Sequence, residues 1–274
     1  MESGVVVGYD QSSPGERVLE EAAAEAARRE VPLTVVHARN TAHHVAEEGA
    51  GRVSRRHPGL RVRARSIAGP APAALVEEAS GADLLVLGQR GLGGLGRFGG
   101  FRGLAGFGGG LRPGSAALRT VARAACPAMV VRGPEHRTRG TVLAAVTVGA
   151  DAEELLDVAF AEAAARGARL KAVSAMENHW SRMFARDAGQ AGRAEQALEQ
   201  LLAPWPDRYP GVVADHELVE GSPATFLTAA TTYADLIVVG VRRRAGGRRG
   251  TRVGPIAETL LMHADCPVVV VPHN

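Results

Sequence analysis

The chain contains the same arrangement of residues twice, and this duplication constrains the fold more than any other feature. Residues 83–132 combine a short apolar run, a glycine-rich loop, a helical pattern and a second apolar run, and residues 235–272 repeat that order. A repeat of ~135 residues is too long for a solenoid unit and indicates two duplicated domains. We expect these domains at residues 1–134 and 139–274, joined within the polar segment GPEHRTRG.

Apolar runs alternate with helical patterns through each half. Val5–Val7 is a continuous apolar run, as in a parallel strand covered on both faces. The alternation predicts an α/β fold of two Rossmann-like, doubly wound domains in tandem, each with a five-stranded parallel sheet. The expected strands include 5–8, 33–37, 60–67, 83–87, 128–131, 212–219 and 268–271, and the expected helices include 41–56, 70–79, 115–125, 185–202 and 222–232.

Charge is nearly balanced over the whole chain but not along it. The formal net charge of +3 gives no indication of a nucleic-acid-binding protein. However, residues 89–134 hold seven arginines and no acidic residue, and residues 236–257 also lack acids. Both strand–loop–helix segments are therefore locally positive and favour anions.

The two cysteines, Cys126 and Cys266, stand at the same place in each half. We expect both to be buried as small apolar residues, without a disulfide. Met1 leads directly into the first strand, so we expect no signal peptide. No apolar run approaches the ~18–20 residues of a membrane span, which predicts a cytoplasmic protein without a membrane partner.

The loop that follows the fourth strand has the composition of a phosphate site. Gly88 and Gly91 suit a backbone that approaches a ligand closely, and Gly114-Ser115 begins the next helix. Backbone N–H groups between a strand end and a helix N-terminus can converge on a phosphate. The alternative is an ordinary turn, with Ser115 as an N-cap, and the two roles are compatible.

Asp10 directly follows the first strand. Its carboxylate is placed to accept hydrogen bonds from a bound ligand. The alternative is an Asx-turn that starts the first helix through Ser12 and Ser13.

Together these segments resemble a tandem universal stress protein, over almost the whole chain. The likeness rests on VVVGYD, DLLVLGQRG, the Gly-Ser pair and the Cys-Pro before the last strand. It implies an adenine nucleotide alpha hydrolase-like fold that binds ATP, with or without Mg²⁺, in the first half. Adenine would lie against Asp10 and the backbone of 36–38, ribose against 87–88, and the phosphates against the glycine-rich positions. The implied site residues are Asp10, Val36, Ala38, Leu87, Gly88, Gly91, Gly114, Ser115 and Ala116.

The second half departs from this family pattern. Thr147 stands in place of the aspartate, Arg243 in place of the second glycine, and Pro255 in place of the serine. Pro255 has neither a hydroxyl nor an N–H to offer a phosphate. We therefore expect the second half to have lost the usual ATP site. Its arginines between 242 and 252 are either a solvated loop or a different anion site.

The first half departs in one respect, because 22 residues separate Gly91 from Gly114 where the family has about nine. Residues 92–113 are rich in glycine, with three phenylalanines and three arginines. They are an insertion without a role, a lid over the nucleotide, or a docking segment for a partner.

Other motifs carry little weight. Gly91–Gly96 matches G-x-G-x-x-G but opens no helix, and Gly109–Ser115 has P-loop spacing without the lysine. No H-x-x-x-H, H-E-x-x-H or C-x-x-C spacing occurs, so we expect no metal site. We identify no catalytic base or nucleophile and expect at most slow ATP hydrolysis.

The preferred function is a regulatory, nucleotide-dependent module in a stress response, read by an unknown partner protein. The two halves would pack as an intramolecular pseudo-dimer, or the chain as a homodimer, through the last strand of each half. The alternatives are an interaction module without nucleotide, or an ATPase or adenylyl-transferring enzyme.

Overall fold

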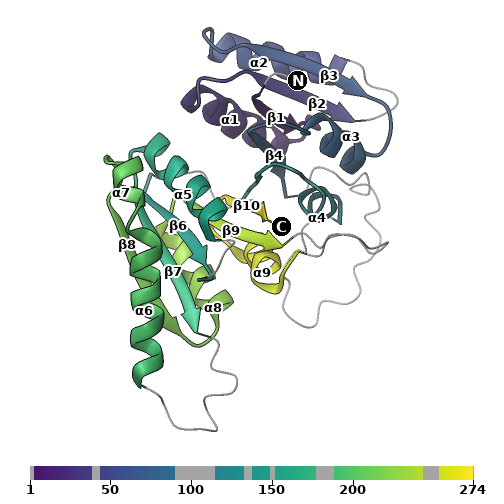
Figure 1. The fold of residues 1–274 in the computed structure, drawn as a ribbon. Helices are drawn as coiled ribbons and strands as arrows, with labels where there is room; N and C mark the ends of the chain where they lie inside the picture. The colour runs from purple at the N-terminus through teal and green to yellow at the C-terminus, as the bar shows by residue number, and fades with distance from the viewer. Residues whose placement is uncertain are drawn as a thin grey trace. The chain divides into compact units, whose positions relative to one another are not determined.

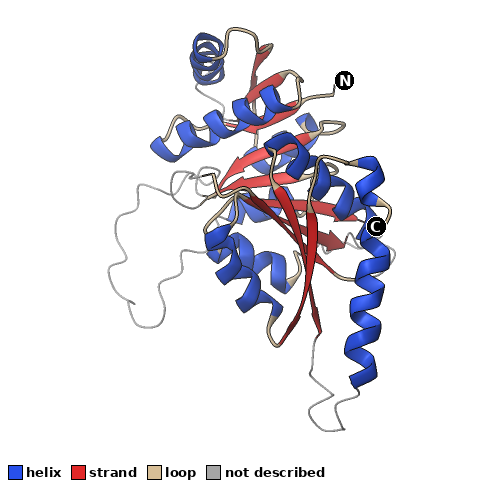
Figure 2. Cartoon of the chain, turned by 90° about the vertical axis from the view of Figure 1, so that its left-hand side faces the viewer, coloured by secondary structure: helices blue, strands red, loops and turns tan. Residues whose placement is uncertain are grey.

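The structure is a computed structural model that describes residues 3–38, 44–89, 115–132, 138–148, 152–176, 188–242 and 253–273. It divides into two compact units: the first holds the chain up to Arg132 together with Val253 and Leu261–His263, and the second holds the other described residues after Arg132. Strands and helices alternate along the chain (Figure 1), and helices flank the strands (Figure 2).

The first unit is a parallel sheet with the strand order β3-β2-β1-β4-β5. Its order reverses between β1 and β4, which is the topological switch point of a doubly wound fold. The strands are β1 (Val5–Gly8), β2 (Leu33–Ala38), β3 (Val62–Ile67), β4 (Leu84–Gly88) and β5 (Ala128–Val131). The helices are α1 (Ser13–Arg28), α2 (His44–Arg56), α3 (Ala71–Glu78) and α4 (Ser115–Val121).

The second unit repeats this topology with the order β8-β7-β6-β9-β10, again all parallel. The predicted α/β fold of two doubly wound domains in tandem is therefore confirmed. The strands are β6 (Thr141–Val146), β7 (Arg169–Met176), β8 (Ala214–Glu220), β9 (Leu236–Arg242) and β10 (Val268–His273). The helices are α5 (Ala152–Arg166), α6 (Ala188–Leu202), α7 (Trp205–Arg208), α8 (Pro223–Ala230), the 3₁₀ turn η1 (Thr231–Tyr233) and α9 (Pro255–His263).

Aliphatic side chains fill the core, as the low aromatic content requires. Val5 and Val7 of β1 are fully buried, and α1 buries Leu19 and Ala22 against the sheet. Both cysteines are buried, as predicted, and neither forms a disulfide. Among the described residues, no helix has the length and apolar character needed to cross a membrane.

Several element boundaries differ by one or more residues from the sequence prediction; β3, for example, begins at Val62 and not at residue 60. α4 ends at Val121 and not at residue 125, because the chain must turn before Cys126, whose helical conformation Pro127 disfavours. β9 and β10 continue to Arg242 and His273, which pair with each other, although neither residue carries a strand signal.

The short helix α7 was not predicted. It is held by aromatic stacking, since the Trp205 ring lies 5.1 Å from that of Phe160 on α5. Tyr209 stacks on the same pair, and its hydroxyl donates to Asp157 Oδ1 at 3.1 Å. Contacts between residues so far apart in the chain leave no local pattern.

Candidate functional site

The carboxyl ends of β2, β1 and β4 lie side by side at one edge of the first sheet. Gly8 pairs with Val36, and the Tyr9 amide donates to the Val36 carbonyl at 2.9 Å. The predicted residues brought together at this edge are Asp10, Val36, Ala38, Leu87 and Gly88. In open α/β sheets, this edge beside the switch point is where ligands bind.

Asp10 forms the Asx-turn that was the alternative interpretation. Its Oδ1 accepts from the Ser12 amide at 3.1 Å and from the Ser12 hydroxyl at 2.6 Å. Ser12 in turn caps α1, because its Oγ accepts from the Gly15 amide at 3.1 Å. Both bonds to Asp10 fall on one oxygen, so the turn fixes the direction of the carboxylate at the N-terminus of α1.

Gly15 is required by this arrangement. A Cβ at Gly15 would come closer to Asp10 Oδ1 than the 3.0 Å that real Cβ atoms keep, and would lie 3.2 Å from Ser12 Oγ. Any larger residue must therefore move the Asp10 carboxylate.

A buried tyrosine anchors the loop to both neighbouring helices. The Tyr9 hydroxyl donates to Glu16 of α1 and accepts from Arg52 of α2 at 2.9 Å, and Arg52 also pairs with Glu16. Burial, reinforced by the hydrogen bond to Glu16, raises the pKa of Tyr9. Burial alone would raise the pKa of Glu16, but its bonds to Tyr9 and Arg52 outweigh this and lower it.

The residue after Asp10 is held in an uncommon conformation. Gln11 has a φ of 60°, in the left-handed region, and its side-chain amide donates to Glu48 of α2 at 2.5 Å. Strained backbone of this kind persists only where the surroundings fix it, and it is concentrated at ligand sites. The contacts among Tyr9, Glu16, Arg52 and Glu48 were not predictable from local patterns, since they join helices α1 and α2, which are separate in the chain.

His37, near the end of β2, carries a buried nitrogen without a partner. The side chain is 5% exposed, and Nδ1 lies 2.8 Å from the Tyr9 carbonyl. A carbonyl only accepts, so Nδ1 carries the proton and Nε2 of the neutral ring is an acceptor. Nε2 is buried and has no hydrogen-bond partner among the residues that the structure describes. Such a group costs about 1–3 kcal/mol unless a donor satisfies it.

The other predicted residues at this edge offer backbone and not side chains. Leu87 is fully buried, and Val36 is 1% exposed. A Cβ on Gly88 would lie 3.0 Å from Val18 of α1, so the missing side chain makes room for helix packing. Gly88 is not among the described glycines with positive φ.

The predicted phosphate contacts are described only in part. Gly91 and Gly114 lie outside the described residues, as does the side chain of Ser115. Ser115 is the first residue of α4, and Ala116 is buried. Residues 92–113 also lie outside the description, so the three interpretations of this segment stay open.

The second unit lacks the polar groups of this edge. Residues 146–148, Val-Thr-Val, stand where residues 9–11, Tyr-Asp-Gln, stand in the first unit. Val146 is buried, and Val148 is 41% exposed. The Asx-turn carboxylate and the tyrosine anchor therefore have no counterpart there.

The carboxyl end of β9 is also built differently. Where β4 ends at Gly88, β9 continues past Gly240 and pairs with the extended end of β10. The His273 ring lies 3.1 Å from the position of a Cβ on Gly240. In the second unit, the additional residues of β9 and the imidazole of His273 thus occupy the region equivalent to the one where β4 ends in the first unit.

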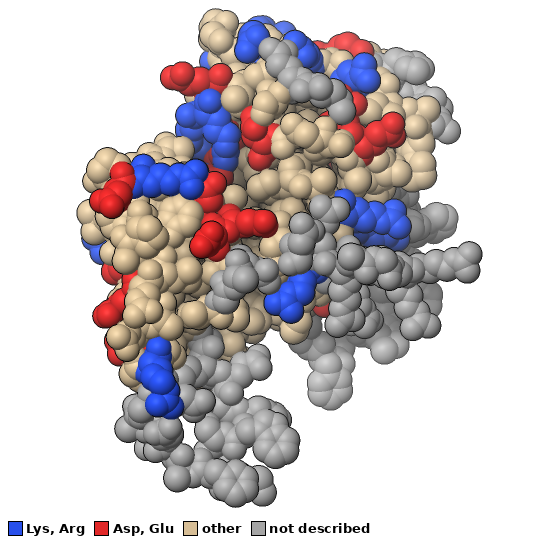
Figure 3. Space-filling view, viewed as in Figure 1, with Lys and Arg blue, Asp and Glu red and all other residues tan. Residues whose placement is uncertain are grey.

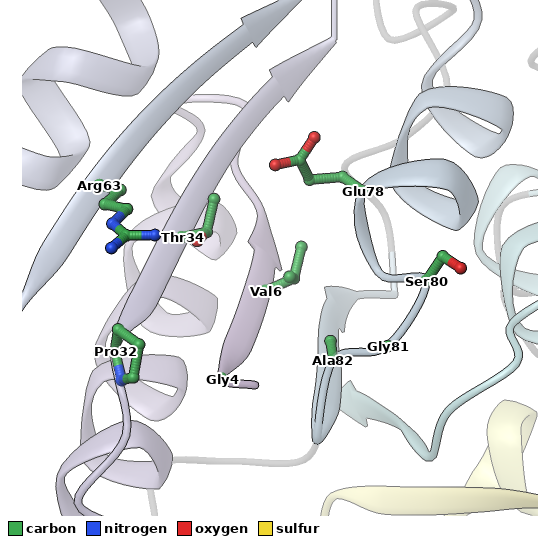
Figure 4. Close-up of a pocket in the computed structure, with 9 residues that line it drawn as sticks. All are labelled: Gly4, Val6, Pro32, Thr34, Arg63, Glu78, Ser80, Gly81 and Ala82. Carbon is green, nitrogen blue, oxygen red and sulfur yellow. The ribbon is translucent and has the colours of Figure 1, made fainter. Parts of the chain in front are cut away.

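A surface pocket of about 160 Å³ lies at the opposite ends of these strands (Figure 4). It opens beside the amino ends of β1 and β2, away from the Asp10 edge, and is not the predicted site. Its lining residues are Gly4, Val6, Pro32, Thr34, Arg63, Glu78, Ser80, Gly81 and Ala82.

The distribution of charged and metal-binding side chains bears on which ligands the described residues could hold. Acidic and basic side chains are intermixed over the face shown in Figure 3, without a field of one sign. Within the described part of the chain, no three His, Cys, Asp or Glu side chains are grouped as a metal site would require.

Comparison with known proteins gives a consistent result. The model of the universal stress protein family matches residues 3–58 and 138–272, which together exceed half of the chain. The chain is 28% identical to the universal stress protein Rv2623 of Mycobacterium tuberculosis, over 97% of this chain and 95% of that protein. It is 30% identical to Rv2005c of the same organism, over 97% and 96%. The structure matches that of a universal stress protein from Archaeoglobus fulgidus with a TM-score of 0.69 and 16% identity, covering 100% of both chains, which shows a shared fold.

Proposed function

Because the chain belongs to the universal stress protein family, we propose that its first unit binds an adenine nucleotide at the carboxyl ends of β2, β1 and β4. The observation that carries this proposal is the organised edge around Asp10. The Asx-turn, the left-handed Gln11 and the tyrosine anchor fix that edge in the first unit, and residues 146–148 of the second unit have none of them.

The adenine base fits this edge chemically. Its exocyclic amino group is a donor, and Asp10 and the backbone of 36–38 supply acceptors next to it. His37 Nε2 is a further acceptor, and no described residue donates to it. An adenine amino group donating to it would remove the cost of the buried nitrogen, whereas a 6-oxo purine would not.

The remaining contacts are proposed by family likeness. Leu87 and Gly88 offer backbone groups to the ribose. The phosphates of ATP, with or without Mg²⁺, would be held by Gly91, Gly114, Ser115 and the Ala116 amide. A cation would be bound mainly by the phosphates.

We assign this site a regulatory output in a stress response and no catalytic step. We assign the edge residues roles in binding the nucleotide or in anchoring the loop that holds Asp10. A partner protein that distinguishes the occupied from the empty first unit would transmit the signal. We also propose that the two domains span residues 1–134 and 139–274 and that they pack as an intramolecular pseudo-dimer.

The test is equilibrium dialysis of the whole chain against labelled ATP at concentrations up to about 1 mM, with and without Mg²⁺. At that concentration the method detects dissociation constants as weak as the millimolar range. Saturable binding that unlabelled ATP displaces supports the proposal. A folded protein that binds none refutes it and favours a nucleotide-free interaction module, while phosphate release above the buffer rate would indicate an ATPase.

A further inference from the structure

The outer strands of the two sheets carry opposite charges at equivalent positions. Among the described residues, β3 ends the first sheet and β8 ends the second. On β3, Arg63 pairs in register with Thr34 of β2, and Arg65 pairs with Val36. Two arginines therefore lie one residue apart on the outer strand of the first unit.

The second unit replaces these arginines by acids. Lys171 and Val173 of β7 occupy the positions of those β2 residues in the duplication, and they pair with Asp215 and Glu217 of β8. Equivalent positions in two copies of one fold thus carry opposite charges.

These side chains lie on the face of the sheet that α2 leaves uncovered. A Cβ on Gly49 of α2 would contact Val35, so α2 covers the face of that residue. Successive strand residues point to opposite faces, which places Arg63 and Arg65 on the other one. Figure 4 shows Arg63 there, beside Thr34 of β2. The Arg65 side chain is 61% exposed.

Neighbouring side chains of opposite charge offset part of each patch. Glu78 Oε1 lies 3.3 Å from Arg65 Nε, and Lys171 Nζ lies 2.5 Å from Glu217 Oε2. Exposed Arg61 extends the basic patch along the chain, and Asp215 is exposed on the acidic one. We call Arg61, Arg63 and Arg65 the basic edge, and Asp215 and Glu217 the acidic edge.

The outward backbone groups of the two strands follow the same pattern. The Arg61 carbonyl accepts from Leu33 of β2, and the Val213 carbonyl accepts from Leu170 of β7, both at 2.9 Å. Because backbone groups alternate in direction along a strand, the residues between the charged positions turn outward. These are Val62, Ala64 and Ser66 on β3, and Ala214, His216 and Leu218 on β8. Such a row is a template for another strand.

Antiparallel pairing of β3 with β8 fits both patterns at once. It keeps the two charged faces on the same side of the joined sheet. In the register that sets Arg63 opposite Glu217 and Arg65 opposite Asp215, the outward backbone groups of both strands also face each other. Directly opposed charges on one face of an antiparallel pair attract.

We infer that two copies of this chain associate by antiparallel pairing of β3 from one copy with β8 from the other. The same register sets Ile67 opposite Val213, whose apolar side chain is 74% exposed. Charge on outer strands also deters aggregation, but one sign on both strands would serve that purpose. Opposite signs disfavour β3–β3 and β8–β8 pairs and select the mixed pair.

Each chain carries one strand of each kind. The contact closes into a two-fold dimer when both pairs form between the same two copies, and it continues from copy to copy otherwise. This inference is independent of nucleotide binding, since it uses none of the residues of the proposed nucleotide site.

The test uses charge reversal and sedimentation velocity. The variants R63E/R65E and D215R/E217R are each measured alone and as an equal mixture, at about 0.05 M and about 0.5 M salt. Each variant alone carries like charges on both edges, so its association should weaken by about tenfold or more at low salt. The mixture restores both opposite-sign contacts and should recover the wild-type association, and high salt should weaken the wild type.

A matched control is R55E/R193E, which changes the net charge as much as R63E/R65E does but leaves both edges intact. It should associate like the wild type, and circular dichroism should show that all variants are folded. The inference is overturned if the wild type sediments as a monomer at about 0.1 mM, a concentration well above the micromolar range expected for a specific contact. It is equally overturned if the reversed variants associate like the wild type, or if their mixture shows no recovery.

Discussion

Replacing Gly15 by alanine tests the geometry of the Asp10 edge directly, because helix propensity and packing predict opposite signs. In a helix, Gly→Ala normally stabilises by about 0.5–1 kcal/mol. At Gly15, the new Cβ would overlap Asp10 Oδ1 and crowd Ser12 Oγ. The carboxylate must move, and its bonds to Ser12 with the cap on α1 are weakened or lost.

The magnitude follows from those bonds. A lost N-cap costs about 1 kcal/mol, and each lost hydrogen bond costs about 0.5–1.5 kcal/mol. After the gain in helix propensity, we expect G15A to destabilise the first unit by about 1–2 kcal/mol. At about 2–4 °C per kcal/mol, this lowers its thermal midpoint by about 2–8 °C. ATP affinity should fall with it, because the proposed adenine contact moves.

The matched control is G51A in α2. A Cβ there meets only Arg55 Nη1 at 3.5 Å, which is ordinary van der Waals contact. G51A should therefore keep the usual gain and raise the midpoint. Thermal unfolding followed by circular dichroism compares the two variants, and the reasoning is refuted if G15A stabilises the protein as much as G51A does.

Three further predictions concern buried groups. H37L removes the acceptor Nε2, so the affinity for ATP should fall about tenfold. The affinity for inosine triphosphate, which lacks the amino donor, should change little. Calorimetric titration with both nucleotides measures the difference. The buried Asp235 carboxylate accepts hydrogen bonds from the backbone amides of residues 139–141 at 2.5, 2.8 and 3.3 Å, and D235A leaves these amides without their acceptor. D235A should therefore lower the urea midpoint by the equivalent of about 2–3 kcal/mol. D83A, at the equivalent but exposed position of the first unit, should lower it far less. Burial raises the pKa of the Cys126 thiol to about 11, against about 8.5 in an unfolded chain. The thiol's contribution to folding stability is therefore full below about pH 8.5 and is lost as the pH rises towards 11. The denaturation midpoints of wild type and C126A should converge over that pH range.

The duplication made most of the fold predictable. Apolar runs and helical stripes placed β1 and β2 within a residue of their observed ends, because burial on both faces leaves a continuous local signal. The extension of β9 to Arg242 was not predictable, since it depends on pairing with His273 in another strand. α7 depends likewise on Trp205 stacking against a distant helix.

The residues of the candidate site were likewise predictable only where their signal is local in the sequence. Asp10 was identified by its place after the first strand, and its Asx-turn by the two serines that follow it. The Tyr9–Glu16–Arg52 cluster was missed, because Arg52 approaches from a helix whose distance in sequence carries no spacing rule. The predicted strand 33–37 includes His37, but only the three-dimensional structure shows that Nδ1 is bonded and that Nε2 has no partner among the described residues.

The central claim is that one edge, in the first unit, binds an adenine nucleotide and its twin does not. Calorimetric titration of the whole chain with ATP tests it most directly, repeated with D10A and with T147A at the equivalent position. The account predicts one nucleotide per chain, lost in D10A and unchanged in T147A. Two nucleotides per chain, or equal effects of the two substitutions, would contradict it.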